Sequence, residues 1–348
     1  MRAGRHWDSK NECESKMSNN SIRAKRASSS HTPSPSHTRT DFIGATLVLV
    51  SAIGFSAKAI FIKLAYASPA GGAEVARAAV DPITLLSMRM GIALPFFLLI
   101  ALWSARNATP LTKREWGALT VLGLMGYYGA SLFDFWGLQY ISAALERLIL
   151  FLNPTIVVLL SALLLGYRIV RRDVAALVIS YAGIALVFVH DLKTNQDAVL
   201  FGGALVLVSA VLYAGYLVGA GQMVKRLGGV RFAAYASVVS TAAIMLHFLA
   251  AHDMSALQQP QRVWMLASWM AIISTVLPVL MMAEGMRRIG SSNAAMMSSI
   301  GPASTILLGY LFLNEPITWL QIGGAGLVMI GVLMIGLKKK PIELTQAT

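Results

Sequence analysis

The stretch from Gly290 to Gly336 reads GSSNAAMMSSIGPASTILLGYLFLNEPITWLQIGGAGLVMIGVLMIG, and it decides the class of fold. No charged residue lies between Arg288 and Glu315, and this run is long enough to cross a hydrocarbon layer ~30 Å thick at ~1.5 Å rise per residue. A polar break, Asn314-Glu315-Pro316, separates it from a second apolar run. The pattern predicts a helical hairpin in a membrane, with Pro302 inside its first helix.

The composition of the whole chain supports a membrane protein. Of its 348 residues, 56% are hydrophobic and 13% are charged, whereas about a quarter of the residues in a soluble domain are charged. A soluble fold of this size has no place to bury so much apolar surface. The single cysteine, Cys13, excludes an internal disulfide framework and a cysteine-rich metal site.

Apolar segments of spanning length continue through the chain from Asp41 onward. We predict ten membrane helices, at about Phe42–Tyr66, Pro82–Ser104, Trp116–Leu138, Ile141–Leu165, Val174–Val189, Val199–Ala220, Phe232–Ala251, Val263–Gly285, Ser291–Leu313 and Ile317–Leu337. The fifth segment is the shortest. Residues 1–40 are basic and rich in Ser and Thr, and we expect them to form a disordered N-terminal tail.

The positive charges lie on alternate loops, as the positive-inside rule requires. The loops assigned to the inner side carry Arg106, Lys113, Arg114, Arg168, Arg171, Arg172, Lys225, Arg226, Arg231, Arg287, Arg288 and Lys338–Lys340. The net charge of +13 therefore reports membrane topology, and no nucleic-acid partner is expected. We predict a multi-pass protein of the inner (plasma) membrane, with both termini cytoplasmic and residues 339–348 forming a C-terminal tail.

An internal repeat divides the chain into two halves. Leu47-Val-Leu-Val-Ser-Ala52 recurs as Leu205-Val-Leu-Val-Ser-Ala210, and Asn153-Pro154 aligns with Gly301-Pro302. The halves, residues 41–190 and 198–338, are predicted to be two copies of a five-helix unit. Because five is odd, the copies have opposite orientations in the membrane. Such inverted repeats place a substrate site near the midplane and permit alternating access.

The closing hairpin resembles that of the EamA-type drug/metabolite transporters. The resemblance lies in Gly301-Pro302, in the run Leu-Asn-Glu-Pro-Ile-Thr that begins at Leu313, and in Gln321 and Gly323-Gly324. Through the repeat it extends over roughly Asp41 to Leu337. One position departs from the family pattern: Tyr167 stands where the family usually carries a second glutamate. We therefore interpret Glu315, at a helix–loop junction, as a turn or capping residue.

Ionisable residues within the predicted spans are costly and are candidates for function. They are Lys58 and Lys63 in the first span, Arg89 in the second, Asp134 in the third, Glu146 and Arg147 in the fourth, and Glu284 in the eighth. The six in the first half lie toward the outer side, and their basic excess predicts a vestibule that attracts anions. Lys63 is interpreted as snorkelling to the interface. Asp134 and Arg89 have a structural alternative, in which they pair with each other or with Lys58.

The fourth and ninth spans combine these charges with helix-breaking prolines. Glu146 and Asn153 share a helical face by their spacing, and Pro154 and Pro302 each free a backbone carbonyl one turn earlier. Freed carbonyls are tolerated only inside protein or beside a water-filled path. Aromatic residues of the third span are candidates for lining that path, namely Tyr127, Tyr128, Phe133, Phe135 and Trp136. His247 is interpreted as a packing residue.

Catalytic and nucleotide-binding signatures are absent from the sequence, so we expect neither an enzyme nor an ATP-driven pump. The leading hypothesis is a secondary transporter of a small polar metabolite, without cofactor or metal. The resemblance implies amino acids or related metabolites, export, and coupling to a proton. Two alternatives remain: efflux of lipophilic cationic drugs, and a non-catalytic membrane scaffold or lipid-handling protein. The lipid bilayer is a partner in every case, and a homodimer is a candidate assembly.

Overall fold

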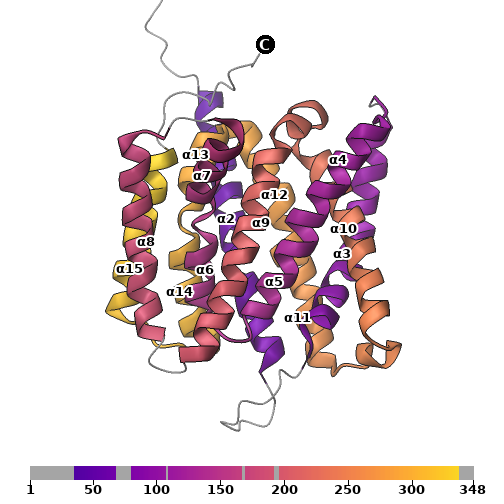
Figure 1. The fold of residues 1–348 in the computed structure, drawn as a ribbon. Helices are drawn as coiled ribbons and strands as arrows, with labels where there is room; N and C mark the ends of the chain where they lie inside the picture. The colour runs from indigo at the N-terminus through magenta and orange to yellow at the C-terminus, as the bar shows by residue number, and fades with distance from the viewer. Residues whose placement is uncertain (1–34, 68–79, 107–108, 167–168, 192–195, 337–348) are drawn as a thin grey trace, which may run out of the picture. The chain divides into compact units, whose positions relative to one another are not determined.

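The computed structural model describes residues 35–67, 80–106, 109–166, 169–191 and 196–336. Every regular element in these ranges is a helix (Figure 1). Within them, nine helical stretches are long and apolar enough to cross a membrane, and Trp319–Ile335 is a shorter apolar helix. The predicted all-α membrane fold is confirmed, and this set of helices is compatible with ten spans.

The elements in chain order keep the labels of Figure 1. They are α2 (Pro35–Tyr66), α3 (Pro82–Ala105), α4 (Lys113–Gly123), the π-helix η1 (Leu124–Gly129), α5 (Ala130–Gly137), α6 (Ala143–Leu150), α7 (Asn153–Leu165), α8 (Arg171–Asp191), α9 (Gln196–Leu227), α10 (Gly229–Ala251), the 3-10 helix η2 (Met254–Leu257), α11 (Gln261–Ala271), the π-helix η3 (Ile272–Val276), α12 (Leu277–Ile289), α13 (Ser291–Ser298), α14 (Gly301–Leu313) and α15 (Trp319–Gly336).

The ends of the chain differ in part from the prediction. Helix α2 begins at Pro35, before the predicted end of the N-terminal tail at Thr40. The rest of that tail, residues 1–34, and the predicted C-terminal tail lie outside the described residues. The chain up to Ile43 forms one unit, and the helical bundle begins at Gly44. The following description concerns the bundle alone.

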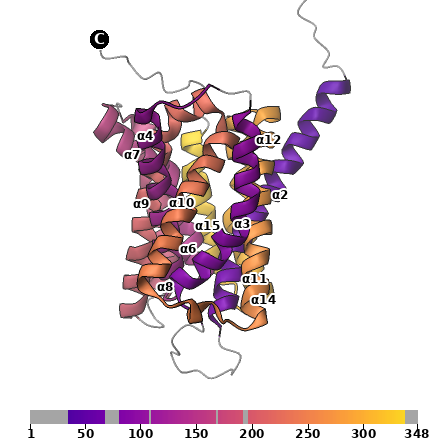
Figure 2. The ribbon, with the colours of Figure 1, turned by 90° about the vertical axis from the view of Figure 1, so that its right-hand side faces the viewer.

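Helices from the two halves pack against each other throughout the bundle. Helix α8 pairs with α15, α3 with α10, and α5 with α9. Figure 1 shows α8 alongside α15 at the left of the view and α3 alongside α10 at its right, and Figure 2 shows the second of these pairs from the side. Each of these pairs joins one helix from the first half to one from the second.

Four of the predicted spans are interrupted, at matching places in the two halves. The third and eighth each contain a π-helical turn, η1 and η3. The fourth is broken between α6 and α7, and the ninth between α13 and α14. Pro154 and Pro302 lie in the first turns of α7 and α14, where a missing N–H leaves no hydrogen bond unmade.

The serine of the repeated sequence motif makes the same kind of hydrogen bond in both halves. Ser51 on α2 donates its hydroxyl to the carbonyl oxygen of Pro278 on α12, at 2.8 Å. Ser209 on α9 donates to the carbonyl oxygen of Ala130 on α5, at 2.7 Å. Both serines are buried. The interrupted third and eighth spans are therefore each bound, just after the π-helical turn, by the first helix of the other half.

Two glycines show the same correspondence. A Cβ atom placed on Gly137 of α5 would lie 2.5 Å from Cγ2 of Val206, and one on Gly285 of α12 would lie 2.5 Å from Cγ2 of Val48. In each case a backbone carbonyl of the facing helix is also within 3.0 Å. Only glycine permits this approach. The matching contacts are those expected of two copies of one five-helix unit.

Alanine substitution tests these close contacts. We expect Gly137→Ala and Gly285→Ala each to lower the free energy of unfolding by ~1–3 kcal/mol, because the added methyl group overpacks a helix interface. The measurement is denaturant or thermal unfolding of the detergent-purified protein. Gly117→Ala is the control, since Gly117 is exposed within α4 and a Cβ atom added there would meet nothing within 4 Å. Equal stability of all three variants would contradict the close packing.

Candidate functional site

A cavity of about 370 Å³ lies inside the bundle. Its wall combines charged, hydroxyl and aromatic side chains from both halves. The lining residues are Phe55, Lys58, Arg89, Met90, Gly126, Tyr127, Ala130, Ser131, Asp134, Arg147, Leu150, Phe151, Asn153, Pro154, Ser209, Tyr213, Ser274, Thr275 and Val279. The interruptions at η1, η3 and the α6–α7 break all contribute to this wall.

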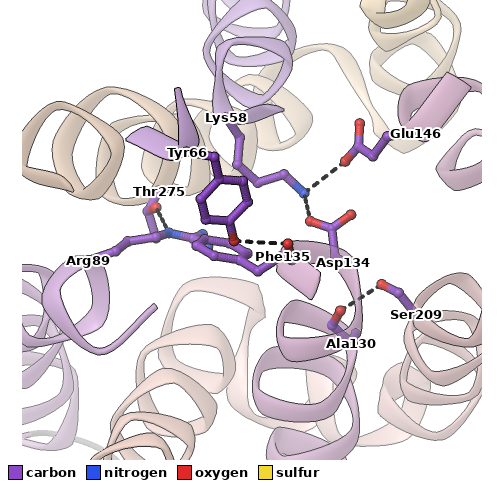
Figure 3. Close-up of polar contacts among 9 residues, drawn as sticks. All are labelled: Lys58, Tyr66, Arg89, Ala130, Asp134, Phe135, Glu146, Ser209 and Thr275. Carbon is purple, nitrogen blue, oxygen red and sulfur yellow. Dashed lines mark hydrogen bonds and ion pairs between the residues drawn. The ribbon is translucent and has the colours of Figure 1, made fainter. Parts of the chain in front are cut away.

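Lys58 of α2 holds two carboxylates at the cavity (Figure 3). Its Nζ lies 2.5 Å from Oδ2 of Asp134 on α5 and 3.3 Å from Oε1 of Glu146 on α6. Asp134 lines the cavity, whereas Glu146 lies behind the wall and is fully buried. Neither side-chain oxygen of Glu146 has a hydrogen-bond partner among the described residues. One ammonium therefore serves two buried carboxylates.

The local structure of α6 explains why neighbouring residues occupy different places. Ser142 caps the helix by accepting a hydrogen bond from the backbone N–H of Leu145, at 3.1 Å. The helix ends at Leu150, before the break. At 3.6 residues per turn, adjacent side chains point about 100° apart. Arg147 consequently lines the cavity, while Glu146 faces Lys58 behind it.

Arg89 of α3 is fixed by the π-helical turn η3 (Figure 3). Its Nε donates to Oγ1 of Thr275 at 2.9 Å, and Thr275 donates its own hydroxyl to the carbonyl oxygen of Met270 at 2.9 Å. The guanidinium carbon lies 5.4 Å from the ring centre of Phe135, a distance typical of a cation–π contact. The π-turn thus orients a hydroxyl oxygen toward the arginine.

Arg147 lies against the break in the ninth span. A Cβ atom on Gly301 would lie 2.8 Å from a terminal nitrogen of the Arg147 guanidinium, so glycine leaves room for it. The carbonyl oxygen of Gly301 accepts a hydrogen bond from Ser56 of α2, at 3.0 Å. The Nε of Arg147 and the side-chain oxygen of Asn153 are both buried without a hydrogen-bond partner among the described residues. The cavity therefore offers one unsatisfied donor and one unsatisfied acceptor.

The second half contributes hydroxyl groups, which were not predicted from the sequence. Ser209, Tyr213, Ser274 and Thr275 all line the cavity. Tyr213 packs against Tyr216, whose hydroxyl donates to that of Tyr127 at 3.4 Å. Hydroxyl side chains are too common in membrane helices to identify a site. The sequence held one indication of two of these residues. Ser209 belongs to the repeated motif, and Tyr213 lies one turn later on the same helical face.

The structure places seven of the predicted residues in the cavity wall and the others elsewhere. Those in the wall are Lys58, Arg89, Tyr127, Asp134, Arg147, Asn153 and Pro154. Asp134 pairs with Lys58. This pairing is one of the two considered from the sequence, the other being a pair between Asp134 and Arg89. Glu146 reaches the site only through Lys58, and Pro302 is buried at the second break.

Three other predicted site residues lie outside the cavity wall, namely Tyr128, Trp136 and Glu284. The hydroxyl of Tyr128 lies 3.0 Å from Nδ1 of His247 on α10, and Trp136 is half-exposed against Phe201. These rings lie on other faces of the third span than Tyr127. Glu284 is held at the end of α12, with Oε1 2.7 Å from a terminal nitrogen of Arg287 and 2.6 Å from Nε of Arg288. Its sequence position within an apolar segment concealed this local pairing.

Glu315 acts as a cap between the halves. Its Oε1 accepts a hydrogen bond from the backbone N–H of Ala143, the first residue of α6, at 3.3 Å. A carboxylate at a helix N-terminus also interacts favourably with the helix dipole. The predicted capping role is confirmed, although the capped helix belongs to the first half. Among the described residues no group of three or more His, Cys, Asp or Glu is placed to hold a metal ion.

Apolar helices that are broken around a buried, charged cavity are typical of membrane transporters. The sequence model of the EamA-like transporter family matches the chain twice, at residues 42–189 and 200–337. The chain belongs to this family.

Named relatives and a solved structure are similar to most of the chain. A Bacillus subtilis protein named "Uncharacterized transporter YcbK" is 32% identical over 298 residues, which cover 81% of this chain and 89% of that protein. "Uncharacterized transporter YyaM" of the same organism is 26% identical over 73% of this chain and 84% of its own length. A crystal structure with 18% identity has a TM-score of 0.56, covering 86% of this chain and 97% of that one, and shows the fold alone.

The buried charge cluster yields a stability prediction. We expect Lys58→Met to lower the free energy of unfolding by ~3–5 kcal/mol, because it leaves two buried carboxylates without a cation. Arg287→Met is the matched control. That arginine also pairs with a carboxylate, but its side chain is 72% exposed, so little change is expected. Thermal unfolding in detergent measures both, and equal losses would show that Lys58 is not a buried counter-ion.

Proposed function

We propose that the protein is a secondary active transporter that exports a small polar metabolite bearing a carboxylate, such as an amino acid. It acts at the inner membrane, with both termini cytoplasmic, by alternating access between two inverted repeats. The observation that carries this proposal is the cavity with two arginines, Arg89 and Arg147. Neither pairs with a carboxylate among the described residues.

The charge of the site favours an anion. Three cationic side chains line the cavity, and they exceed by one the two carboxylates held by Lys58. In a low-dielectric interior an uncompensated positive charge attracts an anionic ligand strongly. The planar guanidinium group of arginine suits a carboxylate in particular, because it offers two parallel N–H donors.

The unsatisfied polar atoms favour a substrate with a second functional group. Nε of Arg147 is a donor and the side-chain oxygen of Asn153 is an acceptor, and both are buried without a partner in the described part of the chain. A ligand that carries a carboxylate and an N–H group satisfies both atoms. The volume of about 370 Å³ is near the lower end of the ~300–1,000 Å³ common for ligand pockets. An amino acid or a derivative of similar size fits these requirements.

The paired interruptions support alternating access. Breaks at matching places in the fourth and ninth spans, and π-turns in the third and eighth, border the cavity or pack beside it. Interrupted helices at the interface of inverted repeats are typical of transporters in which one repeat rocks against the other. A scaffold has no need of such interruptions, nor of a charged interior.

A ligand screen by thermal unfolding tests the substrate class. Ligands that bind the folded state raise its stability, by ~2.7 kcal/mol at a concentration 100 times the Kd. We expect stabilisation by amino acids or other carboxylates, and loss of that effect in Arg147→Gln and Arg89→Gln. Arg231→Gln is the control, because Arg231 is a similarly buried arginine that contacts Tyr235 and Thr109 away from the cavity. Stabilisation only by bulky cations would instead indicate drug efflux.

Cysteine labelling tests alternating access independently of the substrate. Cys13 is the only cysteine, so Cys13→Ser gives a background without thiols. We expect Ser131→Cys, in the cavity wall, to react with a membrane-impermeant maleimide from either side of the membrane. A transporter that alternates exposes this position to both sides in turn, and a bound ligand protects it. Reaction from one side only, under all conditions, would contradict alternating access.

A further inference from the structure

Arg89 and Asp134 carry opposite charges and line the same cavity, yet the described bundle contains no ion pair between them. Asp134 has an oxygen available for such a pair. Its Oδ2 is bound by Lys58 at 2.5 Å, whereas its Oδ1 is buried and has no hydrogen-bond partner among the described residues. An arginine and a carboxylate attract each other strongly in a low-dielectric interior. The separation of Arg89 from Asp134 therefore calls for another contact of the arginine.

Thr275 provides that contact (Figure 3). Its Oγ1 accepts a hydrogen bond from Nε of Arg89 at 2.9 Å, and its own hydroxyl proton is donated to the carbonyl oxygen of Met270, also at 2.9 Å. Because that proton is engaged, the oxygen presents only lone pairs to the arginine. The ring of Phe135 also contacts the guanidinium group, with its centre 5.4 Å from the guanidinium carbon. The Nε donor is thus occupied, and the terminal nitrogens of Arg89 are the donors left for a ligand.

The position of Thr275 is fixed by the turn that carries it. Thr275 belongs to η3, and its bond to Met270 spans five residues, which is the spacing of a π-helix. A Cβ atom on Gly54 of α2 would lie 2.7 Å from the carbonyl oxygen of Ile273, so the turn packs directly against that helix. The hydroxyl group is therefore presented to Arg89 from a backbone that the first half holds in place.

We propose that Thr275 is a positioning residue of the substrate site: it keeps Arg89 from pairing with Asp134, and so keeps the guanidinium group free for the substrate's carboxylate. This inference rests on the proposed function. Without the hydroxyl group, Nε of Arg89 loses its acceptor, while Oδ1 of Asp134 offers an unused one in the same cavity. An arginine that is paired inside the protein no longer attracts an anion. Thr275 acts through Arg89 in this role.

Thr275→Val tests the role, because valine keeps the shape of threonine and removes the hydroxyl group. We expect the Kd of a carboxylate that stabilises the wild type to rise roughly 10- to 100-fold, which corresponds to one hydrogen bond to a charged group. Thr275→Ser retains the hydroxyl group and should bind nearly as the wild type does. The probes are acetate, L-alanine and L-glutamate, and the Kd is obtained from the concentration dependence of thermal unfolding in detergent.

Thr241→Val is the matched control. Thr241 is a buried threonine of α10 that lies outside the cavity wall, and its hydroxyl donates to the carbonyl oxygen of Ser237 on its own helix, at 2.7 Å. The loss of this hydroxyl group is expected to leave the Kd of each probe unchanged.

A double variant separates positioning from a general loss of packing. Asp134→Asn removes the carboxylate that competes for Arg89, so adding Thr275→Val to that variant should change the Kd little. A merely structural role of Thr275 would weaken binding by the same factor in both backgrounds. The non-additivity of the two substitutions is therefore the decisive quantity.

The reactivity of Arg89 tests the same arrangement without a substrate. Methylglyoxal modifies free guanidinium groups, and peptide mass spectrometry of the full-length protein measures the rate at each arginine. We expect Arg89 to react more slowly in Thr275→Val than in the wild type, and to regain its rate in the double variant with Asp134→Asn. Arg287 is the internal reference, since its side chain is 72% exposed at the end of α12.

The outcomes distinguish this inference from the proposed function. An unchanged Kd in Thr275→Val, an equal loss with and without Asp134, or an unchanged rate at Arg89 overturns the positioning role, while the transporter function stands. Stabilisation by lipophilic cations alone overturns the carboxylate substrate and, with it, the role assigned to Thr275, even where the reactivity of Arg89 changes as expected.

Discussion

Every backbone N–H and C=O within a membrane must find a partner inside the protein, and the described bundle depends on this constraint. Its four interrupted spans release backbone groups that an uninterrupted helix would satisfy. Serines of α2 and α9 bind backbone carbonyls beside three of these interruptions: Ser51 binds the carbonyl of Pro278, Ser56 that of Gly301, and Ser209 that of Ala130. Each of these bonds crosses between the halves. The interruptions thus shape the cavity and also join the two halves around it.

The halves have similar backbones but different chemistry. The cationic and carboxylate side chains of the cavity come from the first half, whereas the second half supplies hydroxyl groups. Thr275 shows how the two sets cooperate, because its hydroxyl accepts from Arg89 of the first half while it donates to its own helix. A site of this kind has a charged side and a polar, uncharged side. Such an arrangement suits a substrate whose own charge is concentrated at one end.

The sequence was sufficient for the fold because apolar length, loop charge and the proline positions are local properties. It also drew attention to Lys58, Arg89, Asp134 and Arg147, which line the cavity, since an ionisable residue within a span must face protein or water. It did not separate Tyr127 from Tyr128 at the cavity, because the π-turn η1 changes the helical phase there. It also assigned Glu284 to the site, although arginines one turn later hold that carboxylate at the helix end.

The two breaks show how a repeated backbone can carry one site. At matching positions, the first break has Asn153 and the second has Gly301. Asn153 lines the cavity with an unsatisfied oxygen, while Gly301 lacks a side chain and lets the guanidinium of Arg147 approach its backbone. A second asparagine at Gly301 would occupy the volume that Arg147 now fills. The position of Arg147 against the second break therefore requires the two halves to differ at this residue, although both contain the break.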